Sequence, residues 1–162
     1  MESIQQSGHT ITGWAAASPE QLATARRMCD AWNRGDFETW IEGFTTDCEW
    51  YPSTVGAVEG GGTAIHGHEG LRAYTRQAGE VWGLFDVEMD EGLQRGNLSL
   101  VLGRVRTRGR ASGVETETPM FWVFDQDEHE RTVWGKSFLD FDEALAAAGE
   151  REATLGGGDS HV

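Results

Sequence analysis

The spacing of apolar residues changes once along the chain, and this change constrains the fold more than any other feature of the sequence. Before residue 83, apolar residues recur in two stretches at the three-to-four-residue spacing of a helix face. From Val87 to Leu139, apolar and polar residues alternate, as in strands with one buried face. Helices followed by a run of strands indicate the α+β class.

Capping residues mark the ends of the predicted helices. Ser18-Pro19-Glu20-Gln21 has the pattern of a capping box with proline at the first helical position, and Gly35 ends the helix that follows. Asp36 caps a second, shorter helix. A third helix is expected over 69–82, and a short closing helix over 142–148.

Turn signals divide the alternating segment into three or four long antiparallel strands. These signals are Gly92, Arg95-Gly96-Asn97, Ala111-Ser112-Gly113 and Gln126-Asp127-Glu128.

Charges indicate which face of these strands points inward. Arg104, Arg106 and Arg108 share one face of a strand, and Glu115 and Glu117 share one face of the next. A hairpin near residue 112 places these opposite charges side by side on the solvent face. Odd residues of the first strand and even residues of the second are therefore expected to face inward.

Length and composition indicate one domain of about ordinary size. The 162 residues divide into a flexible N-terminal arm (1–17), a folded domain (18–150) and a flexible C-terminal tail (151–162). A net charge of −14 argues against nucleic acid and anionic membranes as partners. The first residues lack the pattern of a signal peptide, and Cys29 and Cys48 show no disulfide or metal spacing, so a cytoplasmic location is expected.

The histidines do not form a recognisable metal-binding pattern, and no metal site is predicted. His66 and His68 bracket Gly67 at the start of the third helix. One interpretation places both histidines at a pocket mouth, where imidazole titrates near neutral pH. The other, which we favour, places His68 in the first turn of the helix on a surface loop and His66 at the end of a short strand.

Several segments together carry a family resemblance. The two capped helices joined by Asn33-Arg34-Gly35-Asp36, the segment Phe44–Pro52, the helix start Gly67–Leu71 and the end Phe138-Leu139-Asp140 resemble the nuclear-transport-factor-two-like superfamily. Within it, the chain is most similar to the SnoaL-like group, relatives of polyketide cyclases and ketosteroid isomerases. The resemblance spans roughly residues 19–149.

This resemblance implies a cone-shaped fold. A curved antiparallel sheet would wrap around the N-terminal helices, as in a cystatin-like α+β barrel, with an apolar pocket in the open end. Many members of the group are homodimers without a metal or cofactor, so neither is expected here.

The catalytic residues known from two relatives are absent at the matching positions. Ketosteroid isomerases carry two aspartates where this chain has Tyr51 and Met120, and a tyrosine where it has Met28. Where related epoxide hydrolases carry their triad, it has Val105, Thr107 and Ser137. Neither chemistry is therefore expected.

Glu49 and Tyr51 are the candidate catalytic residues. By the same alternation, both would face inward from the first strand of the sheet. A carboxylate in an apolar cone has a raised pKa and can move a proton near neutral pH, and a tyrosine beside it can donate a hydrogen bond to a carbonyl oxygen. The alternative is that Glu49 lies at a strand edge, in solvent or paired with an arginine. The predicted substrate-binding residues are Trp32, His66, Tyr74, Val105, Thr107, Thr118, Met120, Trp122 and Ser137.

Three functions fit these features. The first is a cofactor-independent acid–base enzyme of the cyclase, isomerase or dehydratase type, acting on a hydrophobic carbonyl-bearing metabolite. The second is a non-catalytic binder of a small apolar metabolite, and the third is a dimerisation module with a filled interior. A homodimer is expected through the outer sheet face, where Phe121, Val123, Trp134 and Lys136 form an apolar strip.

Overall fold

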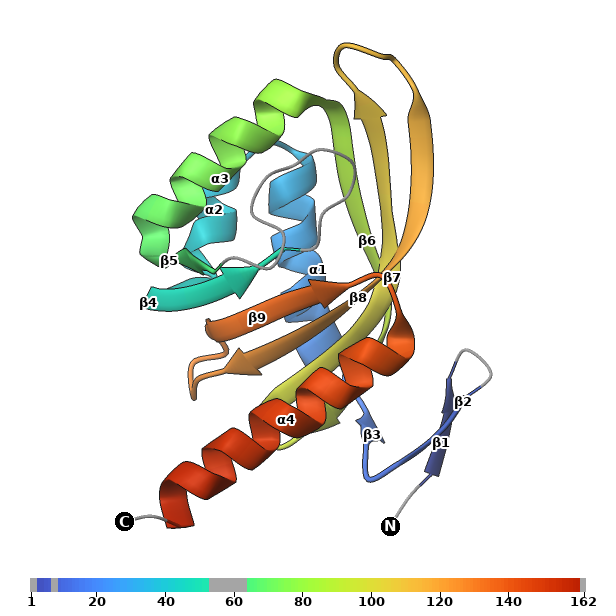
Figure 1. Ribbon diagram of the computed structural model, residues 1–162, viewed down its shortest axis with the longest axis vertical. Coiled ribbons are helices and arrows are strands. Elements are labelled where there is room, and N and C mark those ends of the chain that lie inside the picture. Colours follow the sequence, from blue (N-terminus) through green and yellow to red (C-terminus); the bar gives the residue numbers. More distant parts are fainter. Residues whose placement is uncertain (1–2, 7–8, 53–63, 161–162) are drawn as a thin grey trace.

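The computed structural model describes residues 3–6, 9–52 and 64–160. Its centre is a curved, open sheet that wraps around three helices, while a fourth helix crosses the opposite face of the sheet (Figure 1). This is the α+β cone expected from the sequence.

The sheet has seven strands in the order β3-β6-β7-β8-β9-β4-β5. Neighbours are antiparallel except β4 and β9, which run parallel. The strands, in sheet order, are β3 (Ala15–Ala16), β6 (Trp82–Arg95), β7 (Leu98–Gly109), β8 (Glu115–Gln126), β9 (Thr132–Phe138), β4 (Phe44–Tyr51) and β5 (Ile65–His66).

The helices begin where the capping residues predict. Ser18 and Gln21 form the capping box of α1 (Pro19–Asn33), and the Asp36 side chain accepts a hydrogen bond from a backbone amide of α2 (Phe37–Glu42). Gly35 adopts a positive φ of 77° between these helices, which favours glycine. The remaining helices are α3 (Gly67–Val81) and α4 (Phe141–Ser160).

A bulge and a glycine accompany the bend of the sheet. The β6–β7 register shifts between Met89, which pairs with Gly103, and Glu91, which pairs with Leu102. A side chain at Gly103 would overlap the carbonyl group of Glu88. The turn predicted at Gly92 is wrong, because β6 continues through this residue; glycine is instead favoured there by the close approach of the segment that precedes α1.

The two faces of the sheet bury separate cores. Val105, Met120 and Trp122 join α1–α3 in the inner core, whereas Leu100 and Val123 belong to the outer core. The inward parity predicted for β7 and β8 is therefore confirmed. The arginines of β7 form ion pairs with carboxylates of β6 and β8 on the outer face.

The outer apolar strip is covered by α4 of the same chain. Val123 is fully buried there, and the ring of Phe121 meets that of Phe141 at a centroid distance of 5.7 Å. The homodimer is predicted because this strip would otherwise be exposed, but α4 of the same chain already covers it. The homodimer itself stays a prediction.

Regular secondary structure extends into both terminal segments that are predicted to lie outside the folded domain, and the flexibility of these segments stays a prediction. Helix α4 continues past the expected boundary at residue 150, and Arg151 donates hydrogen bonds to the buried Asp125 of β8. At the other end, β1 (Ser3–Gln6) pairs with β2 (His9–Thr12), β3 pairs with β6, and Trp14 is buried in the outer core. Within the described residues, no helix is long and apolar enough to cross a membrane.

Candidate ligand-binding pocket

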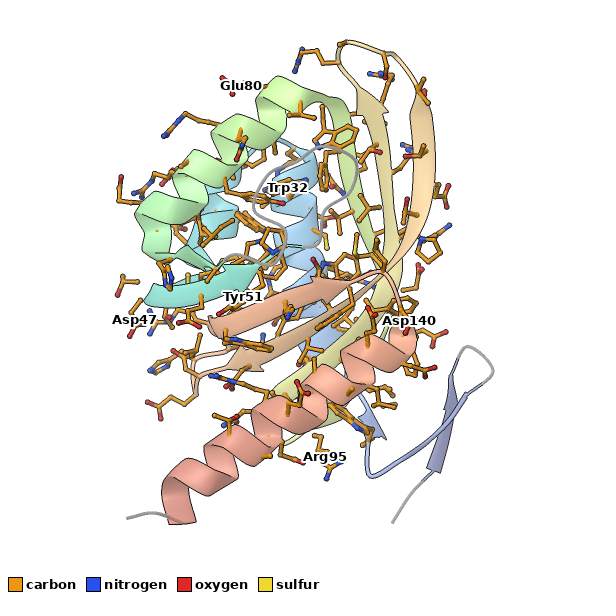
Figure 2. All side chains as sticks on the ribbon, in the orientation of Figure 1. Trp32, Asp47, Tyr51, Glu80, Arg95 and Asp140 are labelled. Carbon is orange, nitrogen blue, oxygen red and sulfur yellow. The ribbon has the colours of Figure 1, made fainter. Side chains whose placement is uncertain are left out.

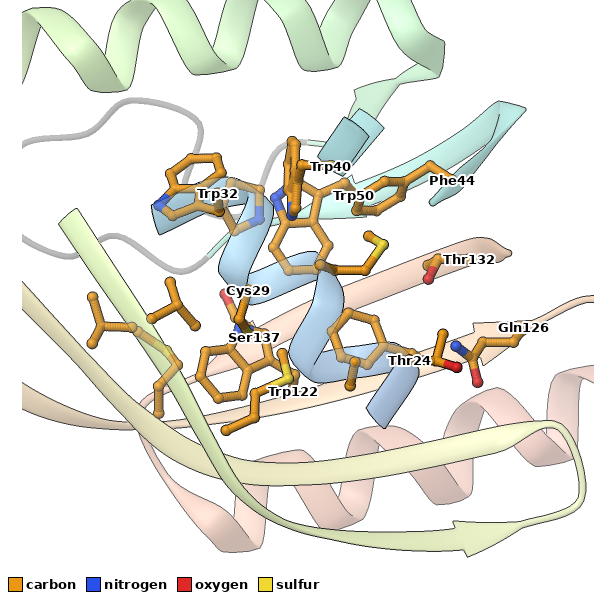
Figure 3. A pocket seen from close by; sticks show the side chains of 18 of the residues that line it. Thr24, Cys29, Trp32, Trp40, Phe44, Trp50, Trp122, Gln126, Thr132 and Ser137 are labelled. Atoms are coloured by element: carbon orange, nitrogen blue, oxygen red, sulfur yellow. The ribbon is translucent and has the colours of Figure 1, made fainter. Parts of the chain in front are cut away.

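A cavity of about 90 Å³ lies between the inner face of the sheet and helices α1–α3 (Figure 3). Side chains from α1, α2, α3, β4, β6, β7, β8 and β9 line it. Since a dry cavity that holds a benzene molecule measures roughly 150 Å³, the enclosed space is smaller than a ring needs, and a ring-sized ligand would extend into the mouth.

Aromatic rings form one continuous wall of the cavity. Trp32 meets Trp40 at a centroid distance of 4.8 Å, Trp40 meets Phe44 at 4.9 Å, and Phe44 meets Trp50 at 6.0 Å, all edge to face. Trp50 is then stacked on Phe124 at 6.1 Å. Such contacts fix the rings beyond the effect of burial alone, so the wall is preformed.

The end of the cavity lining that contains the exposed Glu130 is polar, and we call it the mouth. Thr24 of α1 donates a hydrogen bond of 3.0 Å to the carboxylate of Glu130, a residue held at a positive φ of 63° after β8. Gln126 and Thr132 lie at the same end, far from Trp122 and Ser137 (Figure 3). Among the described lining residues, Glu130 is the one carboxylate, and none is a lysine, arginine or histidine.

The titratable groups deeper in the pocket are held neutral. Burial raises the pKa of the Cys29 thiol to about 12, and it also raises the pKa of the Tyr74 phenol. A contact with the Trp50 indole lowers the pKa of the Tyr74 phenol and so offsets part of the effect of burial. This contact does not have hydrogen-bond geometry. At neutral pH the deep part of the pocket therefore carries no charge among its described residues.

Strand β4 contributes Phe44 and Trp50 to the pocket lining. Trp50 pairs with Gly135 of β9, and Gly135 pairs with the inward-facing Phe124 of β8. The Trp50 ring lies directly against Gly135, where a Cβ would meet it at 2.9 Å. Glycine on β9 thus leaves the space that the indole fills.

The inward orientation predicted for Glu49 and Tyr51 is wrong. Both lie on the opposite face of β4, where the Tyr51 hydroxyl donates a 3.4 Å hydrogen bond to the Glu49 carboxylate. Lys136 stands over the Tyr51 ring at 5.4 Å, and Trp134 lies beside that ring. Figure 2 labels Tyr51 on β4, the strand next to β9. Odd-numbered residues face inward on β7, but this does not determine which residues face inward on β4. Strand β4 pairs with β9 in parallel, and that pairing sets its orientation. Their catalytic role stays a prediction without a place in the pocket.

The structure brings most of the predicted binding residues together. Those that line the cavity are Trp32, Tyr74, Val105, Met120, Trp122 and Ser137. Thr107 is buried but its hydroxyl faces that of Thr116 at 2.8 Å, and Thr118 does not line the cavity.

His66 also lies away from the cavity lining. It is exposed and pairs with Glu49 at the edge of the sheet, whereas His68 donates a 2.9 Å hydrogen bond to the Phe44 carbonyl. The favoured interpretation of His66, at the end of a short strand, agrees with this position, because His66 is the last residue of β5. Over the described ranges, no three histidine, cysteine or acidic side chains group as metal ligands.

Sequence reasoning missed several lining residues, above all Trp50. The signal was present, because Phe44, Cys48 and Trp50 are apolar at even positions while Asp47 and Glu49 are polar at odd ones.

Residues 25–134 match the family model of the SnoaL-like domain. Among solved structures, a nuclear-transport-factor-two-like protein of unknown function from Burkholderia pseudomallei K96243 is similar with a TM-score of 0.66 and 21% identity, covering 80% of this chain and 97% of that one. A protein with a ketosteroid isomerase-like fold from Catenulispora acidiphila DSM 44928, in complex with trimethylamine, has a TM-score of 0.63 and 14% identity, covering 82% and 95%.

A third similar structure is a Mycobacterium tuberculosis protein in complex with estradiol-17β-hemisuccinate. Its TM-score is 0.62 at 13% identity, covering 75% of this chain and 95% of that one. At these identities the likeness shows the fold. No curated protein sequence matches the chain.

Proposed function

The chain belongs to the SnoaL-like family, and on that basis we propose that it binds a small, uncharged and largely apolar molecule inside its cone. The observation that carries this proposal is the lining of the cavity. Aromatic and methionine side chains dominate it, its thiol and phenol are neutral, and Glu130 stands at the mouth.

Charge favours an uncharged ligand over an anion. Since none of the described lining residues is a cation, a buried anion would lose its hydration without gaining a partner. The net charge of −14 adds a long-range repulsion of anions.

Binding is better supported than acid–base catalysis by the predicted pair. Glu49 and Tyr51 face away from the cavity, and Cys29 has a pKa far above neutral, so none of the three places a proton-transferring group at a ligand inside it. Two structural neighbours hold small organic molecules, which agrees with a ligand-binding role for this fold.

A pair of matched probes tests the proposal. Acetophenone is neutral and benzoate is an anion of similar size, and both are titrated while amide shifts are followed by NMR. The variant Ala25→Phe fills the cavity from α1, and Ala23→Phe makes the same change on the same helix outside the lining.

We expect saturable binding of acetophenone to the unmodified protein and to A23F, and at least about tenfold weaker binding to A25F, since the filled space excludes the ring. Benzoate is expected to bind at least about tenfold more weakly than acetophenone. Absence of saturable acetophenone binding, or equal binding by A25F, would overturn the proposal.

A further inference from the structure

Trp50 is held rigidly in the wall of the pocket. Its side chain is 6% exposed, is stacked on the ring of Phe124 and packs against Gly135, the residue of β9 that pairs with both. Phe44 meets it edge to face. The direction of its indole N–H is therefore fixed by packing on several sides.

The indole N–H of Trp50 is buried and makes no hydrogen bond within the described part of the chain, since its contact with the Tyr74 phenol does not have hydrogen-bond geometry. Its neighbour Trp32 differs, because the Trp32 Nε1 donates a 2.8 Å hydrogen bond to the carbonyl of Phe85. More than about nine in ten buried polar groups in proteins are paired, since an unmade hydrogen bond destabilises the fold. An orphan donor in the wall of a cavity indicates that its partner arrives with the ligand.

We propose that the Trp50 indole N–H anchors the ligand by donating a hydrogen bond to an uncharged oxygen acceptor, such as a ketone, quinone or ester carbonyl. The inference deepens the binding function proposed above and rests on it. An indole nitrogen donates but does not accept, so the ligand must carry the acceptor. The aromatic wall beside Trp50 suits the apolar body of such a molecule.

The test removes the N–H and keeps an aromatic ring. Trp50→Phe does so in the pocket, and Trp82→Phe makes the identical change at a second buried, unpartnered indole that does not line this cavity. The probes are acetophenone and ethylbenzene, which differ only in the carbonyl oxygen. Folding of both variants is checked by near-ultraviolet circular dichroism.

We expect W50F to weaken acetophenone binding about tenfold while ethylbenzene changes less than about threefold, because only acetophenone uses the donor. W82F should leave both affinities unchanged. In the unmodified protein, acetophenone should shift the indole proton resonance that disappears in W50F, and ethylbenzene should shift it much less.

An unchanged ratio of the two affinities in W50F would overturn the anchoring role. If both affinities fall equally, Trp50 contributes shape alone, and if neither falls, Trp50 does not contribute to binding. Failure of both probes to bind the unmodified protein would instead overturn the proposed binding function, so the two failures are distinguishable.

Discussion

The ion pair between Arg151 and Asp125 is predicted to hold the C-terminal half of α4 on the sheet. Arg151 Nε and Nη2 lie 3.0 and 2.9 Å from one carboxylate oxygen of Asp125, which is 6% exposed. The guanidinium also stands 5.0 Å over the Trp134 ring. Arg151→Met keeps most of the aliphatic packing and removes the ion pair together with the cation–π contact to Trp134.

The expected cost follows from burial. Breaking a fully buried pair costs about 3–5 kcal/mol, because an unpaired charge remains inside. Since the Arg151 side chain is 22% exposed, water reaches part of the site, and we expect about 2–3 kcal/mol. For a chain of this length, that lowers the melting temperature by about 5–10 °C.

The neighbouring residue supplies a matched control. Glu152 pairs with Arg95 at 3.0 Å, but both side chains are more than 40% exposed, so Glu152→Gln should cost less than about 1 kcal/mol. Stability is measured by urea unfolding and by calorimetry at low protein concentration. Equal small effects of R151M and E152Q would refute the argument that burial of Asp125 makes this pair important.

Two further predictions concern the candidate site. Glu49→Gln should leave the acetophenone affinity unchanged within about twofold, because the carboxylate lies on the outer face of β4, and a loss of tenfold or more in the same titration would restore Glu49 to the pocket. Burial raises the pKa of Cys29 from 9.0 to about 12, so its thiol ionises at lower pH in the unfolded chain than in the folded one. The contribution of this thiol to the free energy of unfolding is therefore complete below pH 9 and is lost as the pH rises towards 12. Cys29→Ala should therefore reduce the fall in unfolding free energy between pH 8 and 10 by about 1 kcal/mol, and an unchanged fall in urea titrations would contradict the burial of the thiol.

The sequence was sufficient for the parts of the fold that local signals determine. Ser18 and Asp36 cap the helices as expected, and the arginines of β7 identify the outer face of the central hairpin. What failed were inferences that depend on pairing distant segments. The orientation of Glu49 depends on the parallel register of β4 with β9, and the cover of Val123 depends on where α4 docks. The cover of Val123 has no signature within one strand, whereas the alternation of Phe44, Cys48 and Trp50 with Asp47 and Glu49 already indicates the orientation of Glu49.

The distribution of charge connects the fold to the kind of ligand. On β7, Arg104 and Arg106 point outward to carboxylates of neighbouring strands, while Val105 between them points into the inner core. On β4, polar and apolar residues also alternate, so that Glu49 faces outward and Trp50 faces inward. Because the charged side chains of these two strands lie on the outer face of the sheet, recognition of a ligand in the cone depends on the shape of the aromatic wall and on uncharged hydrogen-bond donors. The unpaired indole of Trp50 is the donor that such a pocket offers to a ligand oxygen.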